Sequence, residues 1–188
     1  MIKPYLKALV QGQTLTENDF SNITDAIFSE QVDDVSLGAY LAELSCRGAT
    51  ADAVVGTVKT LRRYSPQVHF SQPVMDIVGT GGDGFNTFNI STTVSFVVAA
   101  AGVPVAKHGN NAATSLSGAA DVLSALGVSM SKRDDKAARY QLDRTGQTFL
   151  YAKQCHPILK TVARVRQQLG LPTIFNIVGP LANPAQPA

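Results

Sequence analysis

Residues 1–64 carry apolar side chains at helical spacing, and this pattern predicts a set of short amphipathic helices. Thr16, followed three residues later by Asp19, resembles a capping box and marks the start of one of them. The residues expected to begin or end the other helices are Gly12, Asp34 or Ser36, Gly48 and Thr50. We therefore expect a small helical N-terminal domain, followed by a linker at residues 65–73, where two prolines stand among residues of mixed polarity.

Beyond this linker, short apolar runs alternate with longer helical patterns, which is typical of a parallel sheet with helices on its faces. The expected elements are a strand at 74–78, a helix at about 91–101, a strand at 103–106, helices at 118–126 and 133–142, a strand at 149–151, a helix at 156–170 and a last strand at 173–178. The predicted fold class is therefore α/β for residues 74–188, joined to the helical domain. No closing element follows the last strand, so we expect the sheet to be incomplete at its C-terminal end.

The composition and charge of the chain limit the kinds of function that it can have. The chain has 188 residues, 45% of them hydrophobic, with a mean hydropathy of +0.06, which suits a globular core. A net charge of +2 without a basic run gives no argument for nucleic acid or a membrane surface. Lys3, Pro4 and Lys7 interrupt any signal peptide, and no run reaches the about 20 apolar residues of a membrane span. We expect a cytoplasmic protein.

A glycine-rich loop follows the first predicted strand. Gly79, Gly81, Gly82 and Gly84 fall within six residues, and the polar segment 89–92 then opens a long apolar helix. Glycine allows close backbone approach, and the N–H groups and dipole at a helix N-terminus favour an anion. The loop is therefore a candidate phosphate site, although a tight turn without a ligand remains an alternative.

The same glycines satisfy the spacing of a dinucleotide-binding loop, which needs an acidic residue about 20 positions further on for the ribose hydroxyls. No Asp or Glu lies between Asp83 and Asp121, and the next predicted strand ends at Lys107. The sequence therefore lacks the acidic residue that a nicotinamide-dinucleotide site needs. Because ligands gather at the carboxyl ends of parallel strands, we expect residues 79–83 and 107–110 to lie together.

Five motifs in a fixed order carry a more specific resemblance. They are GTGGD at 79–83, NIST at 89–92, KHGN at 107–110, SGxAD at 117–121 and FNxxGPLxNP at 175–184. Together they resemble the anthranilate phosphoribosyltransferases, over nearly the whole chain. The resemblance implies transfer of phosphoribosyl from phosphoribosyl diphosphate to the amine of anthranilate in tryptophan biosynthesis. It also implies Mg²⁺, a homodimer formed through the N-terminal helices, and packing of the helix at 156–170 back onto the helical domain.

The resemblance assigns each site residue a role by its motif position. Lys107 is expected to give a point charge to a phosphate, and His108 to orient substrate or accept the amine proton. Ser91 is the expected magnesium ligand. Gly79, Asn110 and Arg166 are expected to meet anthranilate, Arg166 as a bidentate partner of its carboxylate; without the motif, a surface salt bridge is the better reading of Arg166. The residues expected to bind phosphoribosyl diphosphate are Gly79, Gly81, Gly82, Asp83, Thr87, Asn89, Ile90, Ser91, Thr92, Lys107, Gly109, Asn110, Asn111, Ser115 and Ala119.

The sequence also departs from the family pattern. Asn111 and Pro172 stand where the family usually has Arg, Leu116 where a basic residue is frequent, and Ala119 where Ser is frequent. The family's Asp-Glu pair for a second magnesium is expected beyond residue 188, so we interpret the chain as an N-terminal portion that is inactive alone. Two alternatives remain open: a pyrimidine nucleoside phosphorylase, and a non-catalytic phosphate-ligand-binding relative.

Overall fold

The computed structural model describes residues 2–80, 88–112, 117–130 and 134–187, and its chain divides into two compact units. Unit 1 comprises residues 1–65 and 156–182, and unit 2 comprises residues 66–155 and 183–188. The fold class predicted from the sequence is confirmed: a helical part is followed by an α/β part with parallel strands. In the described residues no helix is both long and apolar enough to cross a membrane.

Four helices open unit 1, and the last three begin at residues whose side chains cap them. Thr16 and Asp19 form the expected capping box, while Asp33 and Thr50 each accept a backbone N–H of the first turn of their helix. Asp33, rather than Asp34 or Ser36, is therefore the N-cap of the third helix. The four helices are α1 (Lys3–Val10), α2 (Glu17–Phe28), α3 (Asp34–Arg47) and α4 (Ala51–Arg63).

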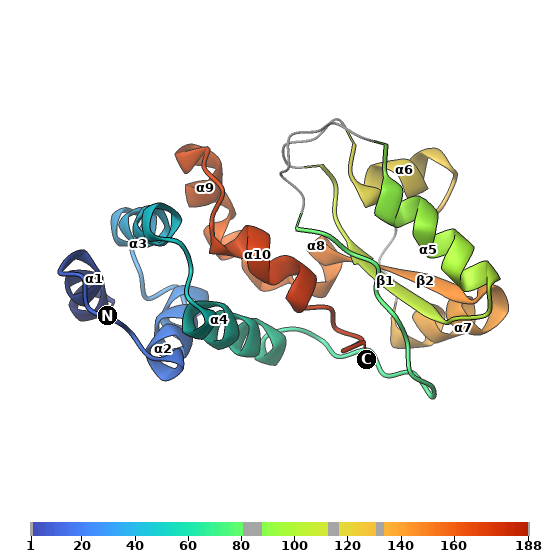
Figure 1. The fold of residues 1–188 in the computed structure, drawn as a ribbon, viewed down its shortest axis with the longest axis horizontal. Coiled ribbons are helices and arrows are strands. Elements are labelled where there is room, and N and C mark those ends of the chain that lie inside the picture. Colours follow the sequence, from blue (N-terminus) through green and yellow to red (C-terminus); the bar gives the residue numbers. More distant parts are fainter. Residues whose placement is uncertain (1, 81–87, 113–116, 131–133, 188) are drawn as a thin grey trace. The chain divides into compact units, whose positions relative to one another are not determined.

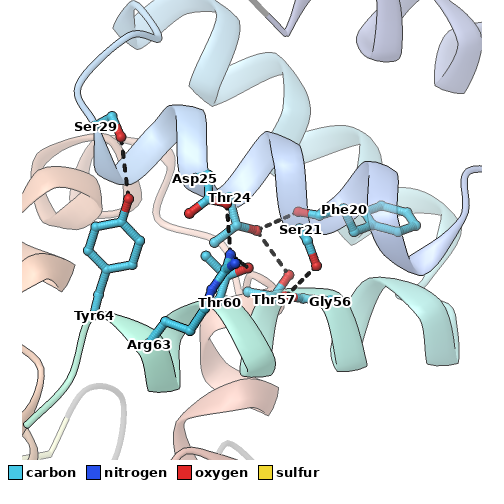
Figure 2. A network of polar contacts seen from close by, with 10 residues as sticks. All are labelled: Phe20, Ser21, Thr24, Asp25, Ser29, Gly56, Thr57, Thr60, Arg63 and Tyr64. Atoms are coloured by element: carbon cyan, nitrogen blue, oxygen red, sulfur yellow. Dashed lines mark hydrogen bonds and ion pairs between the residues drawn. The ribbon is translucent and has the colours of Figure 1, made fainter.

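Helices α2 and α4 lie side by side and are joined by polar side chains along their contact (Figure 2). Ser21 donates to the Gly56 carbonyl at 3.3 Å, and Arg63 donates to Asp25 at 2.7 Å. Gly56 is essential to this approach, because a Cβ there would lie 2.5 Å from the Glu17 carbonyl oxygen. The absence of a side chain at residue 56 therefore sets how closely the two helices pack.

The C-terminal helices complete the core of unit 1 (Figure 1). A short 3₁₀ turn at Pro157–Leu159 leads into α9 (Lys160–Leu169), which packs against α3 and ends at Gly170 in the left-handed conformation. Helix α10 (Ile174–Leu181) packs against α3 and α4. One continuous apolar cluster results, to which every helix of unit 1 contributes.

The strand predicted at 173–178 is wrong, because this segment forms α10. Thr173 and Asn176 make a capping box, in which Asn176 accepts the Thr173 N–H at 2.9 Å. The buried residues are Ile174, Phe175, Val178 and Ala182, a helical spacing that leaves Ile177 and Leu181 exposed. Consequently residues 74–188 are not one compact unit, and the sheet edge expected at this segment does not exist.

Unit 2 contains the sheet. Strands β1 (Val105–Gly109) and β2 (Gln147–Tyr151) pair in parallel, with Gly109 opposite Tyr151 at their carboxyl ends. Helix α5 packs against both strands and α7 against β2 (Figure 1). The helices of this unit are α5 (Ile90–Ala100), α6 (Ala119–Ala125), α7 (Asp135–Thr145) and α8 (Ala152–Cys155).

The strand predicted at 74–78 reduces to a single parallel bridge between Met75 and Val105. Met75 donates its N–H to the Pro104 carbonyl and accepts the Ala106 N–H, both at 2.9 Å. Val74 is buried, but Met75 and Val78 are exposed, so the segment lacks the two covered faces of a central strand. It still runs parallel to β1, so the glycine loop leaves from the carboxyl side of this bridge.

Candidate functional site

Of the ten described residues that are expected to bind phosphoribosyl diphosphate, four lie in β1 or directly after it, and the others are Gly79 and residues at the starts of α5 and α6. Lys107 and His108 lie within β1, and Gly109 ends it. Lys107 is only 1% exposed, and its Nζ donates to the Ile77 carbonyl at 2.5 Å. Its ammonium is therefore directed at the segment that leads to the glycine loop.

Asp76 organises the inside of this region and was missed by the sequence reasoning. One carboxylate oxygen accepts the backbone N–H of His108 at 3.2 Å, and the other accepts the side-chain amide of Asn183 at 2.8 Å. The Asn183 amide also donates to the Ala106 carbonyl at 2.9 Å. Asp76 and Asn183 thus join three segments that are distant in sequence. An acidic residue inside a predicted buried strand was the available signal, because a buried carboxylate needs partners.

Burial acts on the two charged groups in opposite directions. Burial raises the pKa of Asp76, although the Asn183 and His108 hydrogen bonds and the Lys107 charge oppose this. Burial lowers the pKa of Lys107, and the charge of Asp76 opposes that shift. Each charge therefore favours the charged form of the other group.

The start of α5 carries the polar NIST segment. Asn89 precedes the helix, and its side-chain amide donates to the Ser117 hydroxyl at 2.7 Å. Ser91 is half-buried. Thr92 is 1% exposed, and its hydroxyl has no hydrogen-bond partner among the described residues. Gly79 and Ile90 are exposed.

The segment after β1 is fixed by Asp121 of α6. One Asp121 oxygen accepts the backbone N–H groups of Ala112 at 2.9 Å and Gly118 at 2.8 Å, and the other accepts the Asn111 amide at 2.5 Å. These bonds hold the pKa of Asp121 below its usual range, Ala112 contributing most. The carboxylate therefore stays ionised as the common acceptor of the segment.

Two glycines allow the close backbone approaches around this segment. A Cβ on Gly118 would lie 2.3 Å from the Ala112 nitrogen, and one on Gly109 would lie 2.9 Å from the Phe149 ring. Ala119, half-buried as the first residue of α6, lies next to Gly109, and the Ala120 N–H donates to the Asn110 carbonyl at 3.1 Å. Asn110 itself is exposed at the end of β1.

Arg166 belongs to unit 1, apart from the residues above. It is half-buried on α9, donates to Asn176 at 3.2 Å and lies 5.6 Å from the Phe175 ring centroid. Burial lowers its pKa, and within the described residues its Nε has no hydrogen-bond partner. None of the described contacts of Arg166 is an ion pair, so they do not support the alternative reading of a surface salt bridge.

Several predicted site residues lie outside the described residues: Gly81, Gly82, Asp83, Thr87 and Ser115. The same holds for any part they would take in a metal site. Among the described residues, no group of three or more His, Cys, Asp or Glu side chains is placed to hold a metal. Ser91 offers a single neutral oxygen, and hard cations such as Mg²⁺ take several oxygen ligands. The described residues alone do not fit a magnesium site.

Two family models match the chain in sequence. Residues 3–65 match the helical bundle domain of a glycosyl transferase family, and residues 71–188 match the a/b domain of that family. Curated relatives agree. An anthranilate phosphoribosyltransferase of Dehalococcoides mccartyi is 43% identical over 185 residues, which cover 98% of this chain and 54% of the relative. One of Methylocella silvestris is 47% identical, with 98% and 52% covered.

Solved structures give the same picture. Anthranilate phosphoribosyltransferase from Thermus thermophilus matches with a TM-score of 0.87 and 38% identity, over 96% of this chain and 55% of that one. The Saccharomyces cerevisiae enzyme in complex with PRPP and Mg matches with a TM-score of 0.88 and 31% identity, over 97% and 55%. The chain thus spans about half the length of the relatives it matches. Because the two family models together cover nearly all of its residues, the chain belongs to this glycosyl transferase family, with a helical bundle domain followed by an a/b domain.

Proposed function

We propose that the chain provides the helical domain and the phosphoribosyl diphosphate-binding region of an anthranilate phosphoribosyltransferase. In this reaction the bond from C1 of the ribose to diphosphate breaks, a bond from C1 to the anthranilate nitrogen forms, and the amine loses a proton. The observation that supports this most is the gathering of NIST, KHGN and SGxAD residues around the ends of β1 and β2. Similarity to enzymes of this name, 43–47% identical over 98% of the chain, supports it independently.

The proposed task of unit 2 is to hold charge and position the ribose. Asn89 and Thr92 donate to phosphate oxygens, and the Thr92 hydroxyl, which has no partner among the described residues, is suited to this. Lys107 stabilises negative charge, and it gives up its bond to the Ile77 carbonyl if its ammonium reaches a phosphate. Asn110 and Gly79 face anthranilate, and His108 orients substrate. Positioning and electrostatic stabilisation of this kind lower the barrier to phosphoribosyl transfer.

Magnesium, assembly and location are further parts of the proposal. A similar yeast enzyme carries PRPP and Mg in its structure, and Ser91 remains the predicted ligand from this chain. No step is derived through the ion, because the described residues do not build a site for it. We also propose a homodimer through the N-terminal helices and a cytoplasmic location, both on the family resemblance.

Equilibrium binding tests the core of this proposal. Titration calorimetry of the 188-residue chain with phosphoribosyl diphosphate, with and without Mg²⁺, should give weak binding. Anthranilate fluorescence should show no turnover by this chain, because its described residues offer the metal a single neutral oxygen. Uridine with phosphate is the matched control for a nucleoside phosphorylase. No binding of phosphoribosyl diphosphate, or phosphorolysis of uridine, would contradict the proposal.

Arg166 gives a separate test of the anthranilate site. Its Nε is unpartnered in the described residues, so the guanidinium has capacity for a carboxylate. Arg166→Ala should weaken anthranilate binding roughly tenfold to a hundredfold, because bonds to charged groups are the stronger ones, and should leave phosphoribosyl diphosphate affinity unchanged. Arg164→Ala is the control, since Arg164 lies on the same helix but pairs with Asp34. Equal effects of the two variants would remove Arg166 from the site.

A further inference from the structure

The side chain of Asn111 lies between residues of two other elements. The Tyr151 hydroxyl, at the end of β2, donates to the Asn111 Oδ1 at 2.5 Å. The Asn111 Nδ2 donates to an Asp121 oxygen of α6, also at 2.5 Å. Both polar atoms of this amide therefore already have a partner within the protein, and one N–H of Nδ2 is left over.

These bonds belong to a larger attachment of the segment after β1. The second Asp121 oxygen accepts the N–H groups of Ala112 and Gly118, and Gly118 lies so close to the Ala112 backbone that a Cβ would not fit. The Asn111 N–H also donates to the Asn110 side chain at 2.9 Å. The position and direction of the Asn110 side chain thus depend on the Asn111 backbone, which the Asn111 side chain holds in place through Tyr151 and Asp121.

We propose that Asn111 is a positioning residue: by joining Tyr151 to Asp121 it fixes the backbone from which Asn110 reaches substrate, and it does not itself touch phosphoribosyl diphosphate. This inference rests on the proposed function, since it takes phosphoribosyl diphosphate as the ligand. It revises the expectation that Asn111 lines the phosphate site. The carboxylate of Asp121 is tolerable near an anion because four donors and the charge of Lys153 surround the cluster.

A charge exchange between the two residues tests the inference. In Asn111→Asp two carboxylates meet across 2.5 Å, so one bond is lost and like charges repel. Adding Asp121→Asn restores every bond, and only the bond between residues 111 and 121 is reversed in direction. The new amide donates to residue 111, its oxygen still accepts from Ala112 and Gly118, and residue 111 still accepts from Tyr151. Asp121→Asn alone should be mild, because the Asn111 amide can turn over and donate to the Tyr151 oxygen.

The readout is phosphoribosyl diphosphate affinity by titration calorimetry, with thermal unfolding alongside. Asn111→Asp should weaken binding about tenfold or more, and the double variant should return to within about threefold of the natural chain. Asp134→Asn, the same change at the N-cap of α7, is the control and should leave affinity unchanged. If Asn111 touched the ligand, the double variant would still present a carboxylate to it and stay weak; that result overturns the inference.

Tyr151→Phe provides a test that leaves the charge unaltered and removes one hydroxyl. It should weaken binding about threefold to tenfold in the natural chain and add nothing in an Asn111→Ala background, because the two changes break the same link. Independent, additive effects of the two changes, or an unchanged affinity of Tyr151→Phe, would overturn the inference while the proposed function stands. If the natural chain itself does not bind the ligand, the proposed function fails, and the inference fails with it.

Discussion

The two units differ in what lies in their interiors. Unit 1 is built around one apolar cluster, in which residues such as Ile23, Leu41 and Leu61 are fully buried. The apolar clusters of unit 2 are smaller, and its most buried side chains include Lys107 and Asn183. Unit 1 is therefore stabilised mainly by apolar burial, whereas unit 2 depends in addition on satisfied polar groups.

The buried polar groups occur in the unit that carries most of the proposed ligand-binding residues. Burying an amide or a charge without partners is costly, so such groups persist where hydrogen bonds compensate for them. In unit 2 the buried polar groups underlie the carboxyl end of β1, where the predicted phosphate-site residues lie. We therefore expect the stability of unit 2, which carries the candidate site, to be more sensitive than that of unit 1 to the loss of a single polar group.

Asp76→Ala should have the largest effect on stability. It removes the acceptor of the Asn183 amide and the charge that opposes buried Lys107. Leaving a buried polar group without its acceptor typically costs about 1–3 kcal/mol, and more where a charge is involved, so we expect a loss of about 2–3 kcal/mol in the free energy of unfolding. Urea unfolding measures it. Asp143→Ala, at an exposed position of α7, is the control; a loss equal to that control would mean that the polar interior contributes little.

His156 sharpens the comparison, because it is a buried titratable group inside unit 1. It is 2% exposed, and its Nδ1 lies 2.6 Å from the Ser65 hydroxyl. Burial lowers the pKa of His156 to about 4. Unfolded, the imidazole takes up its proton near pH 6.5, so between these values the unfolded state binds more protons. The contribution of neutral His156 to the free energy of unfolding is therefore complete above pH 6.5 and is lost as the pH falls toward 4.

Between pH 7.5 and pH 5, His156 should lower the free energy of unfolding by about 2 kcal/mol. Urea unfolding at the two pH values should show it in the natural chain, and His156→Gln should remove that share of the pH dependence. His69→Gln, at an exposed position, should keep it. The same pH dependence in His156→Gln as in the natural chain would show that His156 does not carry it.

Gly56→Ala tests how far unit 1 depends on close apolar packing. The added Cβ would lie 2.5 Å from the Glu17 carbonyl oxygen, so α2 and α4 must separate. Overpacking of this kind costs about 1–3 kcal/mol, and alanine returns up to about 1 kcal/mol as the better helix former. We expect a net loss of about 1–2 kcal/mol in thermal or urea unfolding. Gly38→Ala should be neutral or stabilising, because its Cβ would meet Val165 at an ordinary 3.7 Å.

The sequence predicted unit 1 well where structure is set locally. The Thr16–Asp19 capping box and the Thr50 cap need only neighbouring residues, and both are present. The segment 173–178 was misread because its β-branched residues suit a strand equally well. The apolar core of unit 1, which buries Ile174 and Val178, and the Thr173–Asn176 capping box favour the helix.

In unit 2 the motifs located the site, but its supporting contacts were beyond sequence reasoning. Asn183 bonds to Asp76, 107 residues away, and no local pattern indicates such a pair. Asn111 was interpreted as a lost phosphate contact, since a sequence does not reveal that Tyr151 and Asp121 occupy its amide. Long-range polar contacts of this kind depend on tertiary structure, whereas the glycine loop before a predicted helix suggests an anion site from sequence, and the roles of the NIST residues stay predictions from the family resemblance.

Lys59→Ala should have the smallest effect on stability, and it compares an exposed lysine, Lys59, with the buried Lys107. Lys59 pairs with Glu17 at 2.7 Å, a distance as short as many buried contacts, but the two side chains are 64% and 41% exposed. Water and salt screen such a pair, and holding two long side chains costs entropy, so exposed pairs contribute about 0.2–1 kcal/mol. We expect Lys59→Ala to change the free energy of unfolding by about 0.5 kcal/mol or less. A double-mutant cycle with Glu17→Ala isolates the pair from other effects of truncation. A coupling as large as the loss in Asp76→Ala would contradict the view that burial, and not the short distance, makes the Lys107 interactions important.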